Sequence, residues 1–190
     1  MTQDILVVDD EADIRDLISG ILEDDGHQVR TARDSDEALN AFGKRKPSLI
    51  VLDIWLQGSR MDGLDLLAIF KEMDPDTPVV VISGHGTIET AVAAIRKGAY
   101  DFVEKPFTAD RLLHVVSRAL ETTRLKRENS ELKARSAASD SLIGSSAVMA
   151  ALRASIDRVA QTNSRVLITG PAGAGKELVI RRVVAYGGHQ

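Results

Sequence analysis

Short apolar runs of Val, Ile and Leu recur along the first part of the chain, separated by segments with helical periodicity. The runs are nearly continuous instead of alternating with polar residues, which is typical of strands buried on both faces of a parallel sheet. The pattern predicts strands at residues 5–8, 28–32, 49–52, 79–82 and 101–104.

The segments between the runs carry single apolar stripes, which favour covering helices. One stripe consists of Ile14, Leu17, Ile18, Ile21 and Leu22, and another of Ile88, Ala91, Val92 and Ile95. Residues 34–37, Asp-Ser-Asp-Glu, resemble a capping box, and further helices are expected from about Gly63 and after Pro106. The prediction is an α/β fold, a (βα)5 doubly wound five-stranded parallel sheet, over residues 1–121.

Residues 122–139 are polar and small, and we interpret them as a linker. Leu125 and Leu132 lie one heptad apart, but a coiled coil needs three or four heptads. A solvated helix that extends the preceding one is the favoured interpretation, and the coiled coil stays open as the alternative.

Residues 140–190 are expected to be the truncated start of a second domain. Met149, Leu152, Ile156 and Val159 predict a helix, and residues 165–169 predict a strand that runs into a glycine-rich loop. About 50 residues with one strand are too few to bury a sheet. We therefore expect an incomplete P-loop segment here.

Composition narrows the functional classes. The chain has 190 residues, 44% of them hydrophobic, and lacks both a bilayer-length apolar run and a signal sequence, so a soluble, cytoplasmic protein without a membrane segment is expected. The absence of cysteine excludes disulfides, thiolate metal sites and cysteine nucleophiles. A net charge of -4 without a basic cluster gives no support for nucleic-acid binding by these residues.

Polar residues stand where the predicted strands end. Asp9 and Asp10 follow the first strand, Asp53 the third, Ser83 the fourth, and Lys105 the fifth. Residues at the carboxyl ends of parallel strands converge, so three like charges would meet at one edge of the sheet. A hard divalent cation with oxygen ligands would relieve their repulsion, and Mg²⁺ is the predicted metal.

A metal beside a carboxylate, a lysine and a hydroxyl is also suited to phosphoryl transfer. Asp53 would be the nucleophile, Lys105 and Ser83 would bind the phosphoryl oxygens, and Asp10 would anchor the metal. Taken singly, an aspartate at a strand end can be a helix cap and a lysine before proline can be an exposed loop residue. The combination at these strand ends favours the phosphoryl-transfer interpretation.

Residues 1–121 resemble the receiver domain of a two-component response regulator, through "VVDDE", "LIVLDIWL", "VVVISGHG" and "AYDFVEKPF", in that order. The resemblance implies a flavodoxin- or CheY-like fold, a sensor histidine kinase as phosphodonor, a homodimer and a cis bond before Pro106. It also implies residue roles: phosphoacceptor Asp53, metal-binding Asp9 and Asp10, switch residues Ser83 and Phe102, and phosphoryl-binding Lys105.

The loop after Asp53 is longer than the receiver pattern, because "QGSR" precedes the usual Asp-Gly. This insertion resembles the NtrX-type branch of the NtrC-like regulators, which implies nitrogen-related signalling. Trp55 is expected to give its carbonyl to the metal and to shield the acyl phosphate, and His85 to gate the attacking water. The alternatives are that Trp55 covers apolar surface and that His85 is a solvated loop residue.

The loop "GPAGAGKE" predicts a phosphate cradle formed by Gly170, Gly173, Gly175, Lys176 and Glu177. Glu177 stands where the generic motif has Ser or Thr, so the hydroxyl that meets Mg²⁺ is absent. The segment is similar to the start of the AAA+ ATPase domain of NtrC-like regulators. No second acidic motif or arginine finger follows, so ATP is expected only in the full-length protein.

A phosphorylation-controlled switch is the leading functional hypothesis, which makes the chain a signalling phosphoacceptor rather than an enzyme. A nucleotide-binding P-loop domain that the receiver regulates is the second. A haloacid-dehalogenase-like phosphatase is a third, but the spacing of Asp9, Asp10 and Glu11 does not fit it. The resemblance further implies a transcriptional regulator that contacts DNA through a missing C-terminal domain and acts on sigma-54 RNA polymerase.

Overall fold

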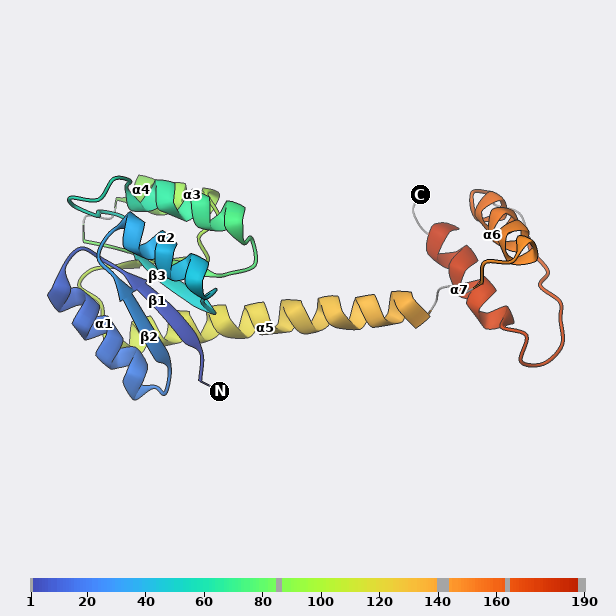
Figure 1. The fold of residues 1–190 in the computed structure, drawn as a ribbon, viewed down its shortest axis with the longest axis horizontal. Coiled ribbons are helices and arrows are strands. Elements are labelled where there is room, and N and C mark those ends of the chain that lie inside the picture. Colours follow the sequence, from blue (N-terminus) through green and yellow to red (C-terminus); the bar gives the residue numbers. More distant parts are fainter. Residues whose placement is uncertain (1, 85–86, 140–143, 163–164, 188–190) are drawn as a thin grey trace. The chain divides into compact units, whose positions relative to one another are not determined.

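The computed structural model describes residues 2–84, 87–139, 144–162 and 165–187 (Figure 1). The chain forms two compact units, Met1–Arg127 and Glu128–Gln190. The first unit holds a parallel five-stranded sheet in the order β2-β1-β3-β4-β5. Its strands are β1 (Asp4–Val8), β2 (Gln28–Ala32), β3 (Leu49–Asp53), β4 (Val79–Ser83) and β5 (Asp101–Glu104). The predicted strands and the doubly wound α/β class are confirmed.

Helices cover both faces of this sheet. In Figure 1, α1 (Ala12–Asp24) and the start of α5 lie on one face, with α2 (Ser35–Lys44), α3 (Gly63–Met73) and α4 (Ile88–Arg96) on the other. Successive side chains of a strand point to opposite faces, so Ile5 and Val7 pack with α1 and α5, while Leu6 and Val8 pack with α2 and α3. Burial on both faces explains why the central strands β1, β3 and β4 are continuous apolar runs.

Side-chain caps fix where the helices on the second face begin. The Asp34 carboxylate accepts a hydrogen bond from the Glu37 backbone N–H at 2.8 Å, and Asp62 and Thr87 cap α3 and α4 in the same way. The Glu37 carboxylate accepts from the backbone N–H of Arg33 at 3.1 Å. It therefore reaches one residue further back than a standard capping box, in which it would meet the N-cap residue itself.

Helix α5 spans Ala109–Ser139, so it continues through the segment interpreted as a linker. The favoured prediction of a helical extension is confirmed. Leu125 and Leu132 are 51% and 64% exposed, as expected for a solvated helix. Among the described residues, no helix is both long enough and apolar enough to cross a bilayer.

The second unit contains α6 (Ala147–Ala160), where a helix was predicted, and α7 (Lys176–Gly187). The prediction of a strand at residues 165–169 is wrong, because this described segment has no regular structure. A strand is held by hydrogen bonds to a neighbouring strand, and the described residues of this unit contain none. Leu167, at 87% exposure, has no sheet in which to be buried.

Candidate functional site

The register of the central strands places the predicted site at one edge of the sheet. Val8, the last residue of β1, pairs with Leu52 of β3, and Asp53 pairs with Ile82 of β4. Asp9 therefore leaves the sheet beside Asp53. Both aspartates are almost inaccessible to solvent, at 0% and 3% exposure.

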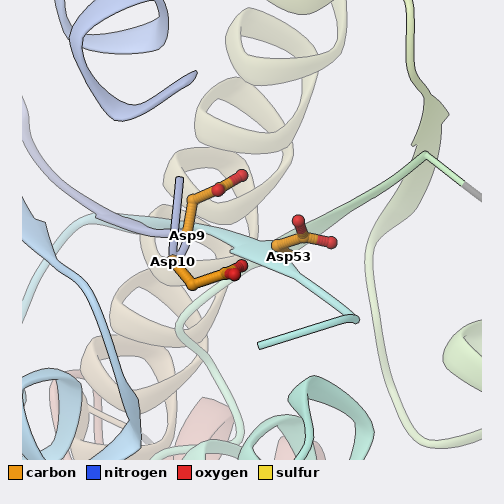
Figure 2. Close-up of side chains that lie close together, drawn as sticks. All are labelled: Asp9, Asp10 and Asp53. Carbon is orange, nitrogen blue, oxygen red and sulfur yellow. The ribbon is translucent and has the colours of Figure 1, made fainter. Parts of the chain in front are cut away.

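The side chains of Asp9, Asp10 and Asp53 lie close together (Figure 2). One carboxylate oxygen of each lies within 4.8 Å of the others. Carboxylate oxygens are the ligands that Mg²⁺ prefers, and waters usually complete its octahedron. The three carboxylates are therefore suitable ligands for a magnesium ion.

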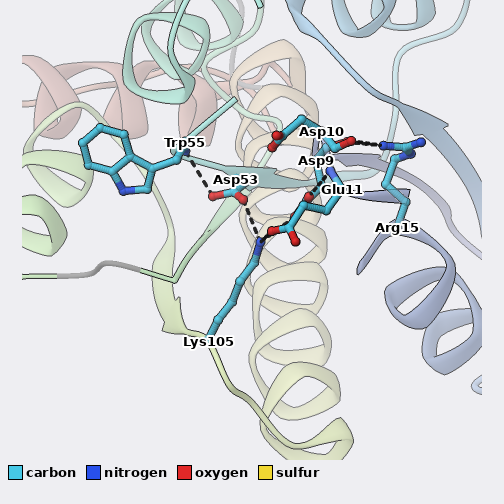
Figure 3. Close-up of polar contacts among 7 residues, drawn as sticks. All are labelled: Asp9, Asp10, Glu11, Arg15, Asp53, Trp55 and Lys105. Carbon is cyan, nitrogen blue, oxygen red and sulfur yellow. Dashed lines mark hydrogen bonds and ion pairs between the residues drawn. The ribbon is translucent and has the colours of Figure 1, made fainter. Parts of the chain in front are cut away.

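Lys105 reaches into this carboxylate cluster from the loop after β5 (Figure 3). Its Nζ atom lies 2.7 Å from Oδ2 of Asp53 and 2.8 Å from Oδ2 of Asp9. The Lys105–Pro106 peptide bond is cis, as the resemblance implied. Burial works to lower the pKa of Lys105, but its hydrogen bonds to Asp53 and Asp9 outweigh burial and raise the pKa. Lys105 is therefore a fixed positive charge at the site.

Backbone N–H groups hold the other oxygen of each buried aspartate. Oδ1 of Asp9 accepts from the Glu11 N–H at 2.9 Å, and Oδ1 of Asp53 accepts from the Trp55 N–H at 3.1 Å. Burial raises the pKa of the Asp9 carboxyl, and the contacts with Lys105 and the Glu11 N–H offset only part of that effect. Each carboxylate is thus oriented from two sides.

Arg15 is a site residue that the sequence prediction missed. Its Nη1 donates to the backbone carbonyls of Asp9 and Asp10 at 2.7 and 2.9 Å, which ties helix α1 to the turn carrying both aspartates. The sequence did contain one indication of this role. A basic residue near the N-terminus of a helix interacts unfavourably with the helix dipole, so Arg15 in this position suggests a specific contact.

The remaining predicted receiver residues lie around this cluster. Ser83 ends β4 and is fully buried, with its carbonyl accepting from the Lys105 N–H at 2.8 Å. Phe102 on β5 is partly buried against the core beneath α2, α3 and α4. The Trp55 side chain is 52% exposed, and Figure 3 shows it pointing away from Asp53. His85 lies outside the described residues.

The glycine-rich loop of the second unit precedes α7. Gly173 and Gly175 have φ angles of 79° and 77°, values that favour glycine, and α7 begins at Lys176. The Lys176 ammonium donates to the carbonyls of Gly170 and Pro171 at 2.9 and 2.6 Å. Glu177 pairs with Arg181 one helical turn later.

Comparison with known proteins gives two family matches. The response regulator receiver domain matches residues 5–117, and the sigma-54 interaction domain matches residues 143–188. The nitrogen assimilation regulatory protein NtrX of Azorhizobium caulinodans is 60% identical over 97% of this chain. The chain spans about 40% of the length of that relative.

Two solved structures are also similar. NtrX from Brucella abortus in complex with ADP is 62% identical, with a TM-score of 0.68, over 98% of this chain and 40% of that one. The isolated receiver domain of NtrX from Brucella abortus is 68% identical, with a TM-score of 0.61, over 63% of this chain and 99% of that one. The receiver domain match covers more than half of this chain, so the chain belongs to the response regulator receiver domain family.

Proposed function

We propose that Asp53 accepts a phosphoryl group from the phosphohistidine of a sensor histidine kinase. The observation that carries the proposal is that Asp53 lies 2.7 Å from the Lys105 ammonium and close to the carboxylates of Asp9 and Asp10. In this step a carboxylate oxygen of Asp53 forms a bond to phosphorus while the bond from phosphorus to the histidine nitrogen breaks. The product is an acyl phosphate on Asp53.

The surrounding residues would each have a separate task. Asp9, Asp10, Asp53 and the Trp55 carbonyl would hold Mg²⁺, which neutralises negative charge on the moving phosphoryl group. Lys105, already bonded to Asp53, would transfer its contact to a phosphoryl oxygen, and the Ser83 hydroxyl would bind another. Phe102 would respond to the movement of Ser83. The indole of Trp55, which points away from Asp53 in Figure 3, would turn toward the acyl phosphate and shield it from water.

This reaction makes the chain a signalling phosphoacceptor that promotes its own phosphorylation. We propose the organisation 1–121 receiver, 122–139 helical linker and 140–190 start of an AAA+ ATPase domain. The match to a nitrogen assimilation regulatory protein supports a role in nitrogen-related regulation. We further propose that the full-length protein is a transcriptional regulator that dimerises and binds DNA through a C-terminal domain. The match of residues 143–188 supports sigma-54 RNA polymerase as a partner.

Acetyl phosphate with Mg²⁺, read by intact mass, tests the phosphoacceptor proposal. We expect one phosphoryl adduct in the wild type, none in Asp53→Asn, and no adduct when Mg²⁺ is chelated. Asp16→Asn is the matched control, because it removes an exposed carboxylate from α1. An adduct that persists in Asp53→Asn would contradict the assignment.

Nucleotide binding by the second unit is the second candidate function. It is favoured by the two glycines with positive φ angles before α7 and by the ADP complex of the Brucella abortus relative. We propose that ATP binding belongs to the full-length protein. Two titrations separate the functions. Tight ATP binding that is lost in Lys176→Ala would support nucleotide binding by the second unit. Mg²⁺ binding that is lost in Asp10→Ala would support the receiver site.

A further inference from the structure

The long loop between β3 and α3 is fixed to the rest of the receiver at two points. The first is its end, where the Gly63 N–H donates to the Ile54 carbonyl at 2.9 Å. This contact brings the start of α3 against the backbone of the phosphoacceptor strand. A Cβ atom on Gly63 would overlap the Asp53 carbonyl oxygen and lie 2.6 Å from the Ile54 Cα. Only glycine permits that approach.

The second point lies within the inserted residues "QGSR". Gly58, with a φ angle of 73°, makes a turn in which the Ser59 N–H donates to the Leu56 carbonyl at 3.3 Å. The turn directs the Ser59 hydroxyl oxygen at the first residue of α2, where it accepts from the Ser35 N–H at 3.0 Å. The first N–H groups of a helix have no partner within it, so Ser59 supplies an acceptor that α2 needs.

The beginning of the loop, ahead of Ser59, carries the groups that orient Asp53. The Trp55 N–H donates to Oδ1 of Asp53, and Ile54, one position earlier, is held by Gly63. A long loop has many conformations, and each fixed point removes some of them. The hydrogen bond at Ser59 divides the loop into two short spans, residues 54–58 and 60–62, and the first of these contains Trp55.

We infer that Gly63 and Ser59 are positioning residues for the phosphoacceptor, acting through the backbone of the loop after Asp53. This inference rests on the proposed role of Asp53, and it gives the hydrogen bond between Ser59 and α2 a function in positioning that residue. Ser59 compensates for the greater length of this loop, and Gly63 sets the position of the Asp53 backbone.

The test uses the full chain and the variants Gly63→Ala, Ser59→Ala and Ser59→Thr. Gly43→Ala and Arg60→Ala are the controls. A Cβ on Gly43 meets nothing within 4 Å, and Arg60 is in the same insertion but is 82% exposed and 3.8 Å from Asp36. Two quantities are measured: amide hydrogen exchange without metal, and the rate of adduct formation with acetyl phosphate and Mg²⁺.

Loss of one hydrogen bond in Ser59→Ala is expected to speed exchange of the Ser35 and Trp55 N–H groups by about fivefold and to slow phosphorylation by a similar factor. Ser59→Thr, which keeps the hydroxyl, is expected to restore both. A shift of the Asp53 backbone in Gly63→Ala is expected to slow phosphorylation by about 100-fold. Both controls are expected to behave as the wild type.

Faster exchange in Ser59→Ala with an unchanged phosphorylation rate would overturn the inference, as would unchanged exchange of the Trp55 N–H. If Gly63→Ala does not fold, the exchange and phosphorylation rates of Ser59→Ala still test whether the loop positions Asp53. A wild type that forms no adduct contradicts the phosphoacceptor proposal instead. In that case the exchange of Trp55 in metal-free protein still shows whether the loop is held at Ser59.

Discussion

The Lys105 ammonium nitrogen lies 2.7 Å from Oδ2 of Asp53, although 52 positions separate these residues in the chain. The same nitrogen lies 2.8 Å from Asp9, so one cation compensates two buried carboxylates. The stability of the receiver and its proposed phosphoacceptor chemistry would therefore depend on the same ion pairs.

Lys105→Met is expected to lower the free energy of unfolding by about 3 kcal/mol in the absence of Mg²⁺, because it leaves buried charges uncompensated. Added Mg²⁺ should recover part of this loss. Urea denaturation with and without Mg²⁺ measures both effects. Lys97→Met is the control, since it removes an exposed pair with Asp65 that contributes less than about 1 kcal/mol. Equal losses in the two variants would contradict the prediction.

Mg²⁺ should stabilise the wild type by binding the folded state. The expected gain is about 2.7 kcal/mol at a concentration 100 times the Kd, seen as a higher thermal midpoint. Asp10→Asn should abolish the gain, because Asp10 contributes one of the three oxygens that lie within 4.8 Å of one another. Asp16→Asn should retain it. A gain that survives in Asp10→Asn would place the metal elsewhere.

The Trp55→Ala variant should shorten the lifetime of the phosphorylated protein, because the indole would no longer restrict the access of water to the acyl phosphate. Trp55→Phe, which keeps an aromatic ring, should retain most of the lifetime. Intact mass, followed after removal of acetyl phosphate, gives both half-lives. An unchanged half-life in Trp55→Ala would leave the exposed indole without this role.

Acid should weaken the receiver through Asp4. Burial works to raise the pKa of Asp4, but hydrogen bonds from Arg30 and Arg45 outweigh burial and lower it. A lowered folded-state pKa gives stability that is present above the unfolded value, about 3.9, and is lost as pH falls through the folded value.

Asp4→Asn should therefore be less stable than the wild type at neutral pH and should lose less stability on acidification. Urea unfolding from neutral to acidic pH measures the difference. Asp74, whose pKa is also lowered, remains in both proteins and supplies the acid sensitivity that persists. If the unfolding free energies of the two proteins fell in parallel with pH, Asp4 would not be a source of the acid sensitivity.

The hydroxyls of Tyr100 and Thr122 lie 3.1 Å apart and join the start of β5 to helix α5. A double-mutant cycle with Tyr100→Phe and Thr122→Val should give a coupling of about 1 kcal/mol in unfolding free energy. Additive effects of the two changes would show that the contact contributes nothing.

Local patterns were sufficient to predict the sheet. The three central strands β1, β3 and β4 are buried on both faces, so their apolar runs were visible in the sequence. The side chain of Asp34, which caps α2, indicated where that helix begins. The position of Asp9 beside Asp53 followed from a general rule about strand ends. These features depend on neighbours in the chain or on the topology.

Other features depend on contacts that no local pattern carries. The tie between Ser59 and Ser35 joins an insertion to a helix 24 positions earlier, and nothing in "QGSR" indicates that partner. The strand predicted at residues 165–169 failed for the converse reason. Its local pattern was adequate, but a strand also needs a paired neighbour, and the described part of the second unit has none.

The strand order has a consequence during synthesis. Because β1 pairs with β3 and not with β2 alone, Asp9 and Asp53 meet only after residues 1–53 have folded together. Lys105 joins them only when the chain has grown past β5. A nascent chain on the ribosome that has reached α4 carries all three acidic residues but not their cation. The cluster of Asp9, Asp53 and Lys105 is therefore completed only after the last strand of the sheet has been made.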